Sequence, residues 1–139
     1  MSILYVDDDI DDQDIFCEAI KLIDPRIVCH VAKDGLQALN LLNELVLLPE
    51  FIFLDLNMPL FNGKEFLIEL RRSRKFRDIH VVMYSTSKNP KDEVDCKKLG
   101  AIDFIVKPST FKEVHHHLNR FIAKAWTTMT SVIIPPADQ

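Results

Sequence analysis

The sequence has no apolar run long enough for a membrane span, and it has few cysteines. No stretch approaches the ~18 consecutive apolar residues of a transmembrane helix, and the opening MSILYVDDD lacks the basic region and apolar core of a secretory signal peptide. The three cysteines, Cys17, Cys29 and Cys96, are odd in number and distant in sequence. This pattern argues against a disulfide framework or a zinc site and favours free thiols in a reducing compartment. We therefore expect a cytoplasmic protein outside the membrane.

An excess of basic residues is also missing. The formal net charge is −4 and the isoelectric point is about 5.7, which argues against a general nucleic-acid-binding protein. There is no internal repeat and no low-complexity linker. A chain of 139 residues that is 47% hydrophobic fits one soluble globular domain.

Short apolar runs alternate with amphipathic segments along the chain. The runs, which predict five strands, cover residues 3–6, 27–32, 51–54, 80–84 and 101–106. The segments with helical periodicity cover residues 11–23, 36–46, 64–74, 90–99 and 110–126. Start and stop signals support the last two: Asn89 before Pro90, Gly100 after residue 99, and Ser109 or Thr110 before residue 111. Such alternation predicts an α/β domain with a doubly wound, five-stranded parallel sheet.

Polar side chains follow four of the five predicted strands. They are Asp7, Asp8 and Asp9 after the first strand, Asp55 after the third, Ser85 and Thr86 after the fourth, and Lys107 with Pro108 after the fifth. Ligands of such sheets bind beyond the carboxyl ends of the strands, so we expect these groups to converge.

Each of these groups also has an ordinary structural explanation. The acids could form a helix start favoured by the macrodipole, which is our preferred interpretation for Asp9, Asp11 and Asp12. Asp55 could form a turn, Ser85 could cap a loop, and Lys107 could lie on the surface. One shared site is favoured because it explains all four strand ends together.

The chemistry of the set agrees with a phosphoryl-transfer site. Clustered carboxylates repel each other, and a divalent cation such as Mg²⁺ relieves that repulsion. Lys107 and the cation would share the charge of a phosphoryl group, and Ser85 would donate a hydrogen bond to it. Asp55 would be the nucleophile that forms an aspartyl-phosphate.

These motifs resemble the receiver domain of two-component response regulators over roughly residues 2–124. The resemblance rests on VDDD after the first strand, DLNMPLFNG after the third, YSTS after the fourth and VKP after the fifth. It implies a flavodoxin-like fold with strand order 2-1-3-4-5 and five helices. We therefore divide the chain into a receiver domain, residues 1–126, and a short C-terminal tail, residues 127–139.

The resemblance also implies a role for individual residues. Asp55 would be the phosphoacceptor, with Asp8 as a direct Mg²⁺ or Mn²⁺ ligand beside Asp55, Asp7 binding the ion through water, and Asn57 contributing its backbone carbonyl. Lys107 would pair with the phosphoryl oxygens, Ser85 and Phe104 would be the switch residues, Gly63 would form the tight turn before the third helix, and the Lys107–Pro108 bond would be cis. Three features depart from the commonest pattern: Ser85 stands where threonine is more frequent, Thr86 is larger than the usual residue and could restrict access to Asp55, and Phe104 lacks a tyrosine hydroxyl.

The implied function is that of a stand-alone, single-domain response regulator. Its partners would be a histidine kinase or histidine phosphotransfer protein and a downstream protein target, reached through the fourth helix, fifth strand and fifth helix. It would not be a turnover enzyme. The apolar SVIIPP of the tail could pack on a second subunit of a homodimer, or the tail could fold on its own domain or be disordered. Two other functions stay open: a phosphohydrolase of the haloacid dehalogenase type, although Asn57 stands where that family has an acid, and a receiver-like binding module that is not phosphorylated.

Overall fold

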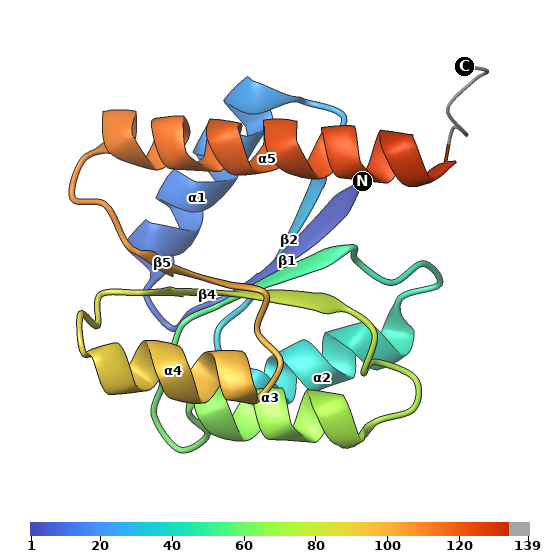
Figure 1. Ribbon diagram of the computed structural model, residues 1–139, viewed down its shortest axis with the longest axis vertical. Helices are drawn as coiled ribbons and strands as arrows, with labels where there is room; N and C mark the ends of the chain where they lie inside the picture. Colours follow the sequence, from blue (N-terminus) through green and yellow to red (C-terminus); the bar gives the residue numbers. More distant parts are fainter. Residues whose placement is uncertain (134–139) are drawn as a thin grey trace.

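Five parallel strands form a single sheet at the centre of the molecule (Figure 1). The computed structural model describes residues 1–133 of the chain, and the side chains of residues 1–127. The strands are β1 (Ser2–Val6), β2 (Val28–Ala32), β3 (Phe51–Leu54), β4 (His80–Ser85) and β5 (Asp103–Val106). Their order is β2-β1-β3-β4-β5 with every neighbouring pair parallel, so the predicted fold class and strand order are confirmed.

Five helices cover the two faces of the sheet. They are α1 (Ile10–Ile23), α2 (Gly35–Glu44), α3 (Gly63–Arg72), α4 (Pro90–Lys98) and α5 (Phe111–Ile133). Figure 1 shows α1 and α5 on one face and α2, α3 and α4 on the other. Helix α5 continues past residue 126 to Ile133, into the segment predicted to be a tail. The end of that segment, residues 134–139, lies outside the described residues, as does the second half of the suggested SVIIPP arm.

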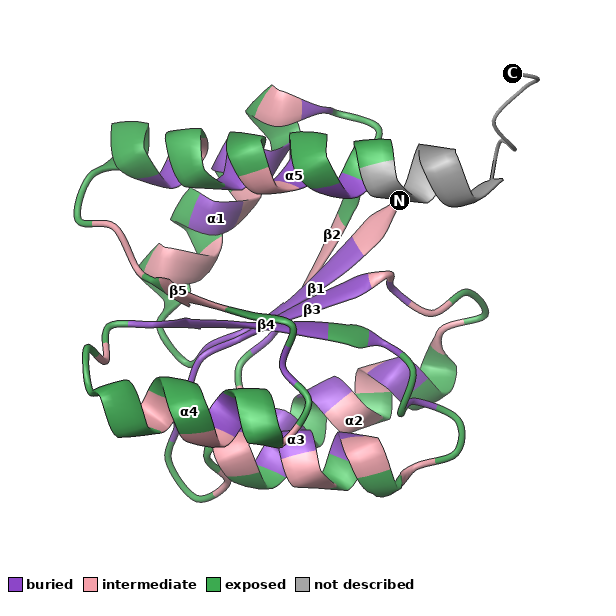
Figure 2. Ribbon diagram, in the orientation of Figure 1, coloured by how far each residue is buried: buried purple, intermediate pink, exposed green. Residues whose placement is uncertain are grey.

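Two apolar clusters form the core, one on each face of the sheet. Alternate residues of the inner strands divide between them: Leu4 and Ile52 pack toward α2 and α3, whereas Tyr5 and Phe53 pack toward α1 and α5. Figure 2 shows β1, β3 and β4 almost entirely buried. The edge strands β2 and β5 are only partly buried, because each has a sheet neighbour on one side alone. The acids of the predicted site, Asp7 and Asp55, therefore follow the most deeply buried strands.

The helix boundaries follow the signals in the sequence. The Asn89 side chain accepts the Lys91 N–H at the start of α4, and Pro90 occupies its first turn. Gly100 follows α4 with φ of 103°, a left-handed conformation that suits glycine. Thr110, rather than Ser109, caps α5, since its Oγ1 accepts the Glu113 N–H at 3.2 Å. Strand β5 begins at Asp103, later than predicted, because the Ala101 N–H still bonds back to α4.

Candidate functional site

The carboxyl ends of the inner strands carry the candidate site. Hydrogen bonds between strands continue just beyond the strand ends: the Asp7 N–H donates to the Ala32 carbonyl at 3.0 Å, and the Asp55 N–H donates to the Val6 carbonyl at 2.9 Å. The Lys107 N–H likewise donates to the Ser85 carbonyl at 2.8 Å. The sheet itself therefore fixes the backbone of these site residues.

Three carboxylates meet at this edge. Asp7, Asp8 and Asp55 each place one oxygen within 4.8 Å of the others. Asp7 and Asp55 are buried, whereas Asp8 is exposed. Carboxylate oxygens are hard ligands that suit Mg²⁺ or Mn²⁺, and a divalent cation would offset their mutual repulsion. The residues present thus fit a divalent metal site.

Lys107 reaches the same cluster from the end of β5. Its Nζ lies 2.6 Å from Asp7 Oδ2, 2.8 Å from Asp12 Oδ2 and 3.8 Å from Asp55 Oδ1. The side chain is only 10% exposed. Burial by itself lowers the pKa of Lys107, but the hydrogen bonds to Asp12 and Asp7 and the nearby Asp55 charge together raise that pKa above its usual value. The ammonium group therefore stays charged and holds the acids together.

Asp7 is the most constrained of the three acids. Its Oδ2 accepts hydrogen bonds from the Tyr5 hydroxyl and from Lys107, and its Oδ1 accepts the Asp9 N–H at 3.0 Å. The Gln13 side chain donates to its carbonyl at 2.7 Å. Burial, and then the Asp7 carboxylate, raise the pKa of Tyr5, so this phenol stays protonated and donates. Both oxygens of Asp7 are occupied by protein donors.

Asp55 has a perturbed proton affinity. Burial is the largest cause and the Asp7 charge the second, and together they raise the pKa of Asp55 from 3.8 to about 6. Lys107 and the backbone N–H of Asn57 act in the opposite direction and lower this pKa, but by less. Near neutral pH the carboxylate is thus ionised in surroundings that disfavour its charge. A bound cation would remove that penalty.

The sequence interpretation missed three participants in this network. Asp9 is the N-cap of α1, accepting the Asp12 N–H at 3.1 Å, as expected for a helix start. The carboxylate of Asp12, however, binds Lys107, so the expectation that Asp12 serves only the helix start is wrong. Tyr5 and Gln13 were not singled out. The two-residue period of a strand places Tyr5 on the same side as Asp7, a signal that could have found it.

The predicted switch residues belong to two neighbouring strands, Ser85 to the end of β4 and Phe104 to β5. Ser85 is fully buried at the end of β4, where its Oγ accepts the Ser87 N–H at 3.3 Å. Thr86 is exposed beside it. Phe104 is half-buried and packs against the apolar cluster on the α2, α3 and α4 side of the sheet. Its assignment as a switch residue stays a prediction.

The loop after β3 brings the backbone close to Asp55. Gly63, the first residue of α3, donates its N–H to the Leu56 carbonyl at 2.9 Å. A Cβ at this position would lie 2.5 Å from the Asp55 carbonyl oxygen and 2.9 Å from the Leu56 Cα. Close backbone packing, not an unusual φ, therefore explains the glycine. Asn57 is exposed in this loop, next to the acids.

The Lys107–Pro108 bond differs from the expectation. Residues 1–133 contain no cis peptide bond, so the predicted cis bond is wrong and this bond is trans. The trans form is the intrinsically favoured one by about 0.5–1 kcal/mol.

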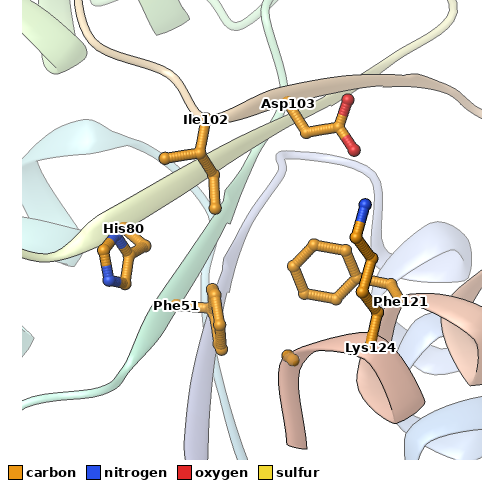
Figure 3. A pocket seen from close by; sticks show the side chains of 7 residues that line it. Phe51, His80, Ile102, Asp103, Phe121 and Lys124 are labelled. Atoms are coloured by element: carbon orange, nitrogen blue, oxygen red, sulfur yellow. The ribbon is translucent and has the colours of Figure 1, made fainter. Parts of the chain in front are cut away.

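A separate cavity of about 290 Å³ lies at the opposite edge of the sheet (Figure 3). Its lining comprises Phe51, His80, Ile102, Asp103, Phe121, Lys124 and Ala125. Phe51, His80 and Asp103 are the first residues of their strands. The cavity is therefore remote from the carboxylates and is not part of the candidate site.

The fold and the site together define a flavodoxin-like α/β domain with an acidic, lysine-containing pocket at the carboxyl edge of its sheet. The chain belongs to the response regulator receiver domain family, whose model matches residues 3–119. It is thus a signalling domain of two-component systems. None of the helices described within residues 1–133 combines the length and apolar character that crossing a bilayer requires.

Solved structures and curated relatives agree with this assignment. The structure of the phosphorylated cyanobacterial phytochrome response regulator RcpA has a TM-score of 0.80 and 26% identity, covering 92% of this chain and 94% of that one. The bacteriophytochrome response regulator RtBRR is 34% identical with a TM-score of 0.70, covering 88% of this chain and 74% of that one.

A protein-glutamate methylesterase/protein-glutamine glutaminase of Methanococcoides burtonii is 35% identical over 99 residues, which are 70% of this chain and 27% of that protein. A probable transcriptional regulator, ycf29, of Pyropia yezoensis is 30% identical over 74% of this chain and 46% of that protein. The chain therefore spans between about a quarter and a half of the length of these curated relatives. Their enzymatic and regulatory activities belong to the whole proteins.

Proposed function

We propose that this receiver domain is a phosphorylation switch in which Asp55 accepts a phosphoryl group from a phosphohistidine. The donor would be a histidine kinase or a histidine phosphotransfer protein. The observation that carries the proposal is that Lys107 pairs with Asp7, Asp12 and Asp55. Two of these acids, Asp7 and Asp55, also form a cluster of three carboxylates with Asp8. A positioned acid, a fixed cation and a metal-binding set are the parts that phosphoryl transfer needs.

The engaged and free oxygens of the site suggest how Mg²⁺ or Mn²⁺ would be held. Asp8 is exposed, so its carboxylate is accessible as a direct ligand together with Asp55 and the backbone carbonyl of Asn57. Asp7 already accepts hydrogen bonds on both oxygens, which favours an indirect role through water. When bound, the ion would offset the negative charge of the acids and of the incoming phosphoryl group.

The chemical step would be performed by groups of this chain. An Asp55 oxygen attacks phosphorus, the P–N bond of the donor breaks, and the donor imidazole leaves with the bonding electron pair. Lys107, already 3.8 Å from Asp55 Oδ1, pairs with oxygens of the transferred group. The Ser85 hydroxyl turns from its local contact to donate to the same group.

The response would spread from this edge to the face of α4, β5 and α5. Movement of Ser85 and its loop would make room for Phe104 to rotate inward, a two-state change of a few kcal/mol. Helix α4 buries only Cys96, so it is the helix held by the smallest apolar contact. Val94, Val106 and Phe111 expose apolar surface on this face, where a downstream protein would bind.

The domain would act in the cytoplasm through protein contacts, and not on a nucleic acid or a membrane. It would catalyse its own phosphorylation and dephosphorylation without turning over a separate substrate. The tail could contribute to a homodimer.

Uptake of phosphate from acetyl phosphate tests the proposal. Wild-type protein with Mg²⁺ should gain a base-labile phosphoryl group, detected as a retarded band on a phosphate-affinity gel, and the gain should disappear with a chelator. Asp55→Asn should abolish it. Asp11→Asn, which changes an exposed acid in the first turn of α1, is the matched control and should behave as wild type.

Uptake by Asp55→Asn at the wild-type level would disprove the assignment. Continuous release of phosphate from small phosphoesters would instead indicate a phosphohydrolase. Failure to bind beryllofluoride with Mg²⁺ would indicate an inert binding module.

A further inference from the structure

The fold brings together two cysteines from different elements of the chain. Cys17 lies in α1 and Cys29 lies in the edge strand β2, yet their Sγ atoms are 2.9 Å apart. Both are free thiols and both are half-buried, so a small oxidant can reach them. Cys96 is different: it belongs to α4 and is fully buried in the core cluster.

The environment of the pair favours thiolate chemistry at Cys17. Either thiol can be the donor of the hydrogen bond between them. With Cys29 as the donor, this bond stabilises the Cys17 thiolate and lowers the pKa of Cys17, although burial and Asp14 oppose this effect. The same hydrogen bond, with burial second, raises the pKa of Cys29, which therefore keeps its proton and donates. Burial raises the pKa of Cys96. A low-pKa thiol beside a second thiol is the arrangement of an oxidisable pair.

The backbone around the pair can accommodate a bond. Closing the contact from 2.9 Å to a disulfide length of about 2.05 Å requires a movement of roughly 1 Å. Strand β2 is at the edge of the sheet and pairs with no other described strand than β1, so it can shift without breaking a second strand pairing. The two cysteines are 12 residues apart and are connected through the turn after α1.

We propose that Cys17 and Cys29 form a peroxide-reactive dithiol that oxidises to an intramolecular disulfide. The Cys17 thiolate attacks one peroxide oxygen, the O–O bond breaks, and the distal oxygen leaves as hydroxide or alkoxide and takes up a proton. Cys17 is then a sulfenic acid. Cys29 sulfur attacks the Cys17 sulfur, the S–O bond breaks and water leaves, with the Cys29 proton consumed in it. Two electrons pass from the sulfurs to the peroxide, and a dithiol reductant reverses the change.

The pair would tie α1 to β2 near the amino end of the sheet, where Cys29 pairs with Ile3 of β1. Helix α1 also carries Asp12, the partner of Lys107, five residues before Cys17. The proposal does not depend on phosphorylation of Asp55, since it rests on the thiol pair alone.

Oxidation of the full chain, monitored by mass spectrometry, tests the inference. Reduced protein is treated with hydrogen peroxide in a chelator-containing buffer, and the remaining thiols are alkylated. The expected product is a monomer with one alkylated cysteine instead of three, and a dithiol should restore all three. Trypsin should release residues 1–21 linked to residues 27–33, because Lys21 and Arg26 lie between the two cysteines and Lys33 ends the second peptide.

Matched variants assign the bond. Cys96→Ser should still form the disulfide, whereas Cys17→Ser and Cys29→Ser should both keep two alkylatable thiols. Without oxidant, iodoacetamide should modify Cys17 about tenfold or more faster than Cys96 at neutral pH. If oxidised Cys96→Ser keeps both thiols, or if the linkage found joins two molecules or includes Cys96, the inference is overturned.

Discussion

Asp55→Asn should stabilise the cation-free protein at neutral pH, and the gain should vanish in acid. The pKa of Asp55 is raised by burial and by Asp7 from 3.8 to about 6. Because the folded state raises this pKa, protonated Asp55 stabilises the folded protein relative to the unfolded chain. This stabilisation is complete below pH 3.8 and is lost as the pH rises through about 6. Asparagine resembles the protonated acid in shape, and it has no proton to lose as the pH rises. Wild type and variant should therefore match near pH 4 and diverge above it.

The size of the divergence follows from the proton affinity. A tenfold change in affinity corresponds to about 1.4 kcal/mol, so the change in pKa of Asp55 gives about 3 kcal/mol as an upper value. Relaxation of the buried site around the charged carboxylate reduces the measured effect to about 1–3 kcal/mol. The variant should be more stable by this amount at pH 8.

Urea unfolding between pH 4 and pH 8 with a chelator measures the effect. Asp11→Asn, at an exposed position of α1, controls for removal of a negative charge. Adding Mg²⁺ at pH 8 should stabilise the wild-type protein, because the ion binds the acids of the folded state. The difference in free energy of unfolding between wild type and Asp55→Asn should therefore become smaller. Parallel stability curves for the two proteins across this pH range, or a variant less stable at pH 8, would refute the reasoning.

Two further substitutions test the packing of the site. Lys107→Met should lower the free energy of unfolding by about 3–5 kcal/mol at neutral pH, because it leaves Asp7 and Asp12 without their cation. Urea unfolding measures this change. A curve that matches wild type would show that the lysine does not stabilise the acids. Gly63→Ala should lower the free energy of unfolding by about 1–3 kcal/mol, because the Cβ of the alanine would lie 2.5 Å from the Asp55 carbonyl oxygen. An unchanged melting temperature in thermal unfolding would contradict this close approach.

Much of the fold could be predicted from the sequence because its signals are local. The apolar runs are short and end in polar residues, and caps such as Asn89 and Thr110 act on the next turn of the chain. Strand-end residues converge whenever strands are parallel, so Asp7, Asp55 and Lys107 could be assigned to one edge before any coordinates. The strand order, in contrast, came from family resemblance, because local patterns do not specify which strands pair.

The sequence by itself determined the alternation of elements and the set of groups delivered to the carboxyl edge. Only the tertiary structure decided which side chains of α1 touch the sheet residues: that Asp12 binds Lys107 and that Cys17 meets Cys29. These contacts depend on how a helix is placed against the sheet, which distant packing sets and no short stretch of sequence encodes. Burial, and with it the raised pKa of Asp55, likewise exists only once the neighbouring strands have excluded water.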